Sequence, residues 1–151
     1  MQKLLTLALT LLCIFTNLIA CNNNYIDKPE VTVYLESCTD TMVVIKATAV
    51  TTGSTALNLL EKVQENGELV FEAIDGGYGA YVTSINGKSE VVNGNEGFSW
   101  MLYTSDEKLS STEFGSVVYN GVTYGQAAVG ASSLTAKAGE YYIWVYEGWS
   151  F

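Results

Sequence analysis

Alternating hydrophobic and polar positions run through the chain after about residue 30 and predict β-strands. Val31, Val33 and Leu35 alternate with polar or amphipathic neighbours, which is the period of two expected for a strand with one buried face. Residues 41–50 are rich in β-branched side chains, which favour strands. Residues 37–40 separate the two segments and predict a turn, so this region is expected to form an antiparallel hairpin.

One helix is predicted over residues 54–66. Ala56, Leu60 and Val63 recur at helical spacing and would form an apolar stripe. Ser54 is a suitable N-cap, and Gly67 is typical of the residue that ends a helix.

Strand patterns return after this helix. Leu69, Phe71 and Ala73 alternate with polar residues, and residues 78–85, 98–104 and 141–146 are rich in β-formers. Asn86-Gly87 predicts a two-residue type I′ hairpin turn, and Asn93-Gly94 and Asn120-Gly121 are similar signals. Residues 107–119 and 125–138 have the weakest patterns. The fold class is therefore α+β: a small β-rich domain of antiparallel strands and hairpins with one main helix, without a repeat or a second domain.

The first 20 residues have the pattern of a secretory leader. Lys3 precedes an uncharged, largely apolar run that ends at residue 19, which is short and polar-interrupted for a membrane-spanning helix. Residues 18–21, Leu-Ile-Ala-Cys, resemble the bacterial lipobox. This resemblance implies cleavage after Ala20 and attachment of lipid to Cys21; an ordinary leader with a coincidental cysteine is the alternative. We expect a leader over 1–20, a lipidated tether over 21–30 and a domain over 31–151, lipid-anchored outside the cytoplasm on a bacterial cell membrane.

Charge and residue types restrict the chemistry. The chain has 16 acidic and seven basic residues, a formal net charge of −9, no arginine and no histidine. An acidic surface repels phosphate backbones, so nucleic acid is not an expected partner. Ser105 and Lys108 match the Ser-x-x-Lys pattern of serine acyltransferases, but no Lys-Thr-Gly motif accompanies them. Residues 93–96 resemble a turn more than a calcium loop. We therefore predict no enzyme and no metal site.

Aromatic residues are unusually frequent, with ten Tyr, three Trp and five Phe. In a strand they alternate between the two faces. If Tyr141, Ile143 and Val145 face the core, the intervening rings of Tyr142, Trp144 and Tyr146 would form an exposed binding surface. The alternative is that these rings pack in the core.

Several motifs occur together in an order that resembles a known family. They are the helix over 54–67, Tyr-Gly-Ala-Tyr-Val-Thr-Ser-Ile-Asn-Gly at 78–87, Trp-Met-Leu-Tyr at 100–103 and the segment 139–146 with its glycine and aromatic strand. In this respect the chain is similar to the transcobalamin-like C-terminal domain, which ends intrinsic factor and transcobalamin and is found in bacterial surface lipoproteins. The resemblance covers about residues 31–146.

The resemblance implies a ligand and a set of contact residues. In the animal carriers this domain closes over cobalamin as a lid, while a helical domain supplies the rest of the pocket. The corresponding corrinoid contacts would be Tyr78, Gly79, Tyr81, Trp100 and Met101. The chain departs from the carriers in having Met101 where they have Gln, in an apparent insertion over 113–133 and in lacking the helical domain.

The predicted function is that of a non-enzymatic, surface-tethered binding module for cobalamin or another corrinoid, with a possible partner protein to complete the pocket. A structural or adhesive module that contacts protein or glycan without a small ligand is the alternative. We expect Trp100→Ala to weaken ligand binding while the domain still folds.

Overall fold

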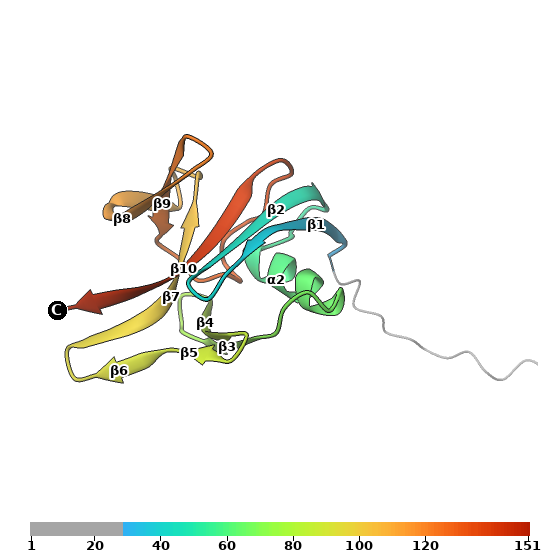
Figure 1. Ribbon diagram of the computed structural model, residues 1–151. Helices are drawn as coiled ribbons and strands as arrows, with labels where there is room; N and C mark the ends of the chain where they lie inside the picture. Colours follow the sequence, from blue (N-terminus) through green and yellow to red (C-terminus); the bar gives the residue numbers. More distant parts are fainter. Residues whose placement is uncertain (1–28) are drawn as a thin grey trace, which may run out of the picture.

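The computed structural model describes residues 29–151, which form two antiparallel sheets and one helix (Figure 1). The predicted leader and Cys21 lie outside the described residues, as does most of the tether. The elements are β1 (Val31–Cys38), β2 (Met42–Val50), α2 (Ala56–Glu65), β3 (Phe71–Asp75), β4 (Ala80–Ile85), β5 (Lys88–Ser89), β6 (Val91–Asn93), β7 (Glu96–Thr104), β8 (Ser110–Tyr119), β9 (Val122–Ala127) and β10 (Tyr141–Ser150). The prediction of a β-rich fold with antiparallel strands and one helix is confirmed for this part of the chain.

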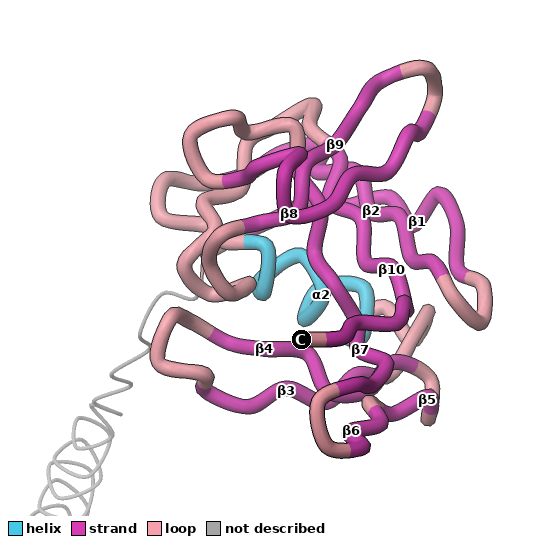
Figure 2. Tube along the Cα trace, turned by 90° about the vertical axis from the view of Figure 1, so that its left-hand side faces the viewer, coloured by secondary structure: helices cyan, strands magenta, loops and turns pink. Residues whose placement is uncertain are grey.

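The larger sheet has the strand order β1-β2-β10-β7-β9-β8, and β6 also pairs with β7. The predicted hairpin of β1 and β2 is present, with Val31 opposite Val50. A smaller sheet contains β3, β4 and β5. Helix α2 packs against β1 and β2 of the larger sheet, and Figure 2 shows its place in the Cα trace.

The N-cap of the helix lies one residue later than predicted. Thr55 is the N-cap, and its backbone N–H donates to Asn58 Oδ1 at 3.0 Å. Ser54 is instead buried and its hydroxyl donates to the carbonyl oxygen of Thr51 at 2.7 Å. Gly67, at φ +77°, ends the helix as predicted. Its N–H and that of Glu68 bond back to the carbonyls of Gln64 and Val63, which is the Schellman arrangement.

Two predicted hairpin turns are confirmed by their backbone angles. Asn86 and Gly87 have φ of 49° and 78°, and Asn120 and Gly121 have φ of 50° and 77°. Both residues of a type I′ turn require positive φ, which asparagine and glycine adopt at low cost. The third predicted turn, at Asn93-Gly94, lies one residue further along the chain: Gly94 and Asn95 are the two residues that connect β6 to β7.

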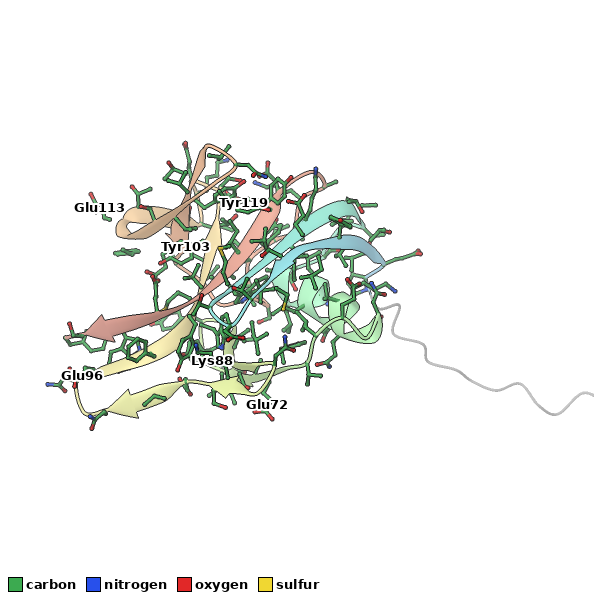
Figure 3. The ribbon with its side chains drawn as sticks, viewed as in Figure 1. Glu72, Lys88, Glu96, Tyr103, Glu113 and Tyr119 are labelled. Atoms are coloured by element: carbon green, nitrogen blue, oxygen red, sulfur yellow. The ribbon has the colours of Figure 1, made fainter. Side chains whose placement is uncertain are left out.

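Strand β10 is buried on both faces over residues 142–144, which excludes an exposed surface of Tyr142 and Trp144 and confirms the alternative that these rings pack in the core. Tyr142 and Trp144 are each 1 % exposed and pack in a core with α2, while Tyr146 packs against the edge of that core. Ile143 is fully buried in a second core on the opposite face, beneath the β8–β9 hairpin. Figure 3 shows Tyr103 and Tyr119 near this hairpin. A central strand covered on both sides has no solvent face, so the side chains of β10 alternate between two cores.

Cys38 is exposed at the end of β1. Its Sγ accepts a hydrogen bond from Asn86 Nδ2 at 3.2 Å. Within residues 29–151, no helix is long and apolar enough to cross a bilayer.

Candidate ligand-binding cavity

The candidate site begins with an interruption along one edge of strand β7. Residues 96–104 of β7 pair with β10 without a break. On the opposite edge, pairing with β6 stops at Phe98 and pairing with β9 starts at Tyr103. Residues 99–102 therefore have no strand partner on that edge. Because backbone groups alternate between the two edges of an antiparallel strand, about half of those in this segment point toward the interruption.

A cavity of about 360 Å³ lies beside this interrupted edge and is called the inner cavity below. It lies among the start of β4, the middle of β7 and the chain over residues 126–131. All five residues that the family resemblance selected contribute to its lining. They are Tyr78, Gly79, Tyr81, Trp100 and Met101. The fold thus brings together two sequence segments whose proximity the chain order alone does not require.

Trp100 belongs to both the cavity and the hydrophobic core. Its side chain is 2 % exposed, and its indole N–H donates to the carbonyl oxygen of Lys88 at 2.7 Å. Trp144 from β10 also lines the cavity and is 1 % exposed. These two buried rings line the cavity and also stabilise the core. The expectation that Trp100 can be replaced while the domain still folds is therefore corrected.

The rim is built around Gly79, which has a positive φ of 110°. A Cβ at this position would lie 2.6 Å from Ser133 Oγ, so the backbone approaches residues 132–133 too closely for a side chain. The N–H of Ala80 donates to Ser132 Oγ at 2.7 Å and holds the two segments together. Tyr78 lies at this rim and is 82 % exposed.

Tyr81 supplies the cavity with a phenol whose position is fixed. Its hydroxyl donates to Glu90 Oε2 at 2.9 Å. Burial, with a contribution from Glu90, raises the pKa of Tyr81 to about 12. The phenol is therefore protonated at neutral pH and remains a hydrogen-bond donor.

Gln126 is a cavity residue that the sequence did not identify. It lies on β9 directly opposite Tyr103 of β7, and its Nε2 lies 3.5 Å from the sulfur of Met101. The carriers have a glutamine where this chain has Met101, so the resemblance implies that a side-chain amide is missing at this position. In the fold, the amide of Gln126 on the neighbouring strand β9 lies beside Met101. No local signal marks Gln126, because only the pairing of β7 with β9 brings it there.

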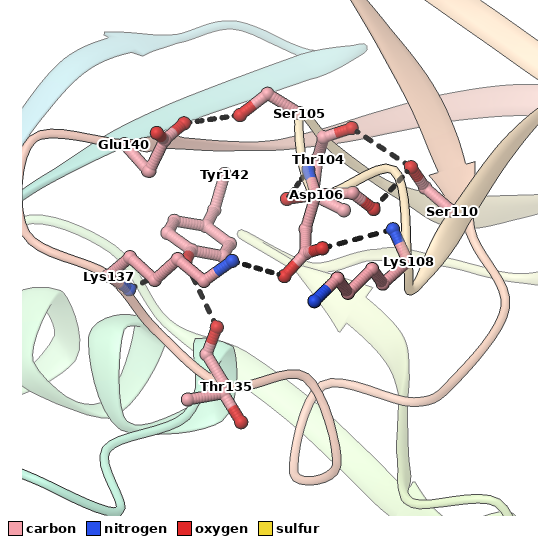
Figure 4. A network of polar contacts seen from close by, with 9 residues as sticks. All are labelled: Thr104, Ser105, Asp106, Lys108, Ser110, Thr135, Lys137, Glu140 and Tyr142. Atoms are coloured by element: carbon pink, nitrogen blue, oxygen red, sulfur yellow. Dashed lines mark hydrogen bonds and ion pairs between the residues drawn. The ribbon is translucent and has the colours of Figure 1, made fainter.

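The Ser-x-x-Lys match does not form a catalytic pair. Ser105 donates its hydroxyl hydrogen bond to Glu140, and Lys108 uses its backbone N–H to bond Asp106 Oδ1 at 3.1 Å (Figure 4). These residues follow β7 in a turn, where the acyltransferase pattern requires a helix. Lys137 pairs with Asp106 at 2.6 Å and holds the pKa of that carboxyl below its ordinary value. The network connects the β7–β8 turn to the segment before β10.

Metal ligands are also sparse in the described fold. Within residues 29–151 no three His, Cys, Asp or Glu side chains gather in a way that could hold a metal ion. Residues 93–96 lie in the turn between β6 and β7.

In comparisons with known proteins, no family model, no curated protein and no solved structure matches the chain.

Proposed function

We propose that this protein is a non-enzymatic binding module that is anchored to a bacterial membrane surface by lipid on Cys21, and that the inner cavity holds part of a flat organic ligand. The observation that carries the proposal is the convergence of Tyr78, Gly79, Tyr81 and Trp100 with Met101 around one cavity. Concave sites with mainly apolar and aromatic walls and a few fixed polar groups are typical of small-molecule binding.

The inner cavity has features that suit a ligand with an apolar face and a polar rim. Trp100, Leu102 and Val82 supply apolar surface, while Tyr81 and Gln126 supply a hydroxyl and an amide. The unpaired edge of residues 99–102 adds backbone donors and acceptors. A corrinoid, which combines a flat macrocycle with peripheral amides, is our favoured ligand.

The size of the cavity limits how much of such a ligand it encloses. Sites that bury a drug-sized molecule have volumes of about 300–1,000 Å³, and the inner cavity, at about 360 Å³, is near the lower limit. A corrinoid is larger than a drug-sized molecule, so only part of it would enter. The segment 126–131, which falls in the apparent insertion, forms one wall. We propose that it takes over part of the role that the helical domain has in the animal carriers and that a partner protein covers the remainder.

Calorimetric titration with cobalamin and cobinamide tests the ligand. The polypeptide of residues 22–151 contains every described element and is the suitable sample. We expect a dissociation constant in the micromolar range, and we expect Met101→Gln, which adds a second amide, to change the affinity without lowering the melting temperature. Absence of heat with both corrinoids would reject the ligand and leave the fold unaffected.

Membrane fractionation tests the anchor separately. Lipidation requires the thiol of Cys21, so Cys21→Ser is expected to release the protein from the membrane fraction, because a stable anchor depends on its acyl chains. Cys38→Ser is the matched control, since Cys38 is exposed and lies in the folded domain. Retention of the Cys21→Ser variant on membranes would contradict the anchor.

An adhesive module without a small ligand is the second candidate. Strand β3 pairs only with β4, and next to its free edge Val70 and Ile74 are 63 % and 57 % exposed. A free strand edge with exposed apolar side chains is suited to contact with another protein. Ile74→Lys would abolish such contact in a pull-down and leave corrinoid binding unchanged.

A further inference from the structure

A second hollow, called the C-terminal groove below, adjoins the inner cavity. Its volume is about 800 Å³, and it shares Tyr81, Met101 and Gln126 with the lining of the inner cavity. Residues 147–151 and the segment of β8 at its shift in pairing register, residues 114–116, form other walls. The end of β10 lies at the opposite side of the described fold from the start of β1 and helix α2 (Figure 1).

The charge of this groove is negative and uncompensated. Glu90 and Glu147 line it, and no lysine does. Neither carboxylate forms an ion pair with any residue of the described part of the chain. Tyr81 donates a hydrogen bond to Glu90, and Tyr103 donates one to Glu147. The two phenols therefore hold the carboxylates in place without neutralising them.

Exposed aromatic rings accompany these carboxylates. Phe114 is 66 % exposed and Phe151 is 99 % exposed. The ring of Trp149 lies 5.3 Å from that of Phe151, centroid to centroid, and its indole N–H donates to Ser99 Oγ at 2.8 Å. Gathered exposed aromatic surface marks binding sites, and the faces of aromatic rings attract cations.

We infer that the C-terminal groove binds a small organic cation that carries an alkylated ammonium group. The carboxylates of Glu90 and Glu147 supply the complementary charge, and the rings of Phe114, Trp149 and Phe151 supply contact for the alkyl groups. A bulky alkylated ammonium gives up its hydration readily and is the kind of cation that aromatic rings recognise. A bare metal ion fits poorly, because the described residues offer no cluster of three ligands.

Calorimetric titration of residues 22–151 with choline tests this inference, and 3,3-dimethyl-1-butanol is the neutral isostere that isolates the charge. We expect saturable binding of choline, with the isostere at least tenfold weaker. Glu147→Gln and Glu90→Gln are each expected to weaken choline binding about tenfold, which corresponds to about 1.4 kcal/mol. Raising the salt concentration should weaken it further, because part of the attraction is screened.

Two variants separate a groove effect from a general one. Glu113→Gln removes the same charge from an exposed position outside the groove, so choline binding should stay within twofold of the wild type. Phe114→Ala removes an exposed ring and should weaken binding severalfold with an unchanged melting temperature; it remains informative if a glutamate variant fails to fold. Equal binding of the isostere, equal weakening by Glu113→Gln, saturable binding of neutral sugars in place of choline, or no choline binding at all would overturn the inference.

Discussion

The inner cavity and the C-terminal groove share three lining residues, yet they use their aromatic rings in opposite ways. In the inner cavity Trp100 and Trp144 are 2 % and 1 % exposed and belong to the core. In the groove Phe114 and Phe151 are 66 % and 99 % exposed. A ring that supports the fold cannot be removed to test binding alone, whereas an exposed ring can. The two hollows therefore require different experiments.

Replacing Trp100 by alanine is expected to have the largest effect. The substitution removes a buried indole and its hydrogen bond to Lys88, so the free energy of unfolding should fall by about 3–5 kcal/mol. Urea denaturation measures this loss. A change below about 1 kcal/mol would mean that Trp100 is not part of the core and would remove the contrast between the two hollows.

Gly130→Ala should have the next largest effect on stability, because the added methyl group would overlap the backbone of Gly79 at the rim of the inner cavity. The added Cβ would lie 2.5 Å from the carbonyl carbon of Gly79 and 2.6 Å from its oxygen, and backbone cannot move aside as easily as a side chain. We expect a loss of about 1–3 kcal/mol in urea denaturation, together with weaker corrinoid binding. Val122→Thr, at an exposed position of β9 outside the cavity lining, is the control and should change neither quantity.

High pH should weaken the fold through tyrosines whose phenols are buried. Burial raises the folded-state pKa of Tyr81 and Tyr142 to about 12, against about 10 for an unperturbed phenol. The unfolded chain therefore loses these protons first as the pH rises. The stabilisation that they provide is fully present below about pH 10 and is lost between about pH 10 and pH 12.

Urea midpoints measured from pH 8 to pH 12 check this expectation. Tyr81→Phe should make the alkaline decline shallower because it removes one of the shifted phenols. Tyr34→Phe alters a phenol that is 62 % exposed and serves as the control. A decline of equal steepness in Tyr81→Phe and the wild type would contradict the role of Tyr81.

Phe114→Ala is expected to have the smallest effect on stability. Its ring is 66 % exposed, so the free energy of unfolding should change by no more than about 0.5 kcal/mol. Thermal and urea denaturation both measure this change. A loss comparable to that of Trp100→Ala would show that the groove rings are structural, and the two hollows would then no longer differ.

Local sequence patterns predicted the elements whose geometry depends on adjacent residues. The alternation from Val31 to Leu35 forms β1, and Gly67 ends the helix because a positive φ is inexpensive for glycine. Asn86-Gly87 and Asn120-Gly121 formed type I′ turns for the same reason. The N-cap was predicted one residue too early because Ser54 and Thr55 are both suitable N-caps in sequence, whereas in the fold Ser54 is buried and its hydroxyl donates to the carbonyl of Thr51.

By itself, therefore, the sequence determined the β-rich class, the single described helix and the turns. Tertiary structure decided which faces are covered. Tyr142 and Trp144 alternate as a half-exposed strand would, but α2 and the β8–β9 hairpin bury both sides of β10. It also decided that Gln126 lies beside Met101. The reason is physical: periodicity reports the direction of a side chain, whereas burial and contact depend on elements that are distant in the chain.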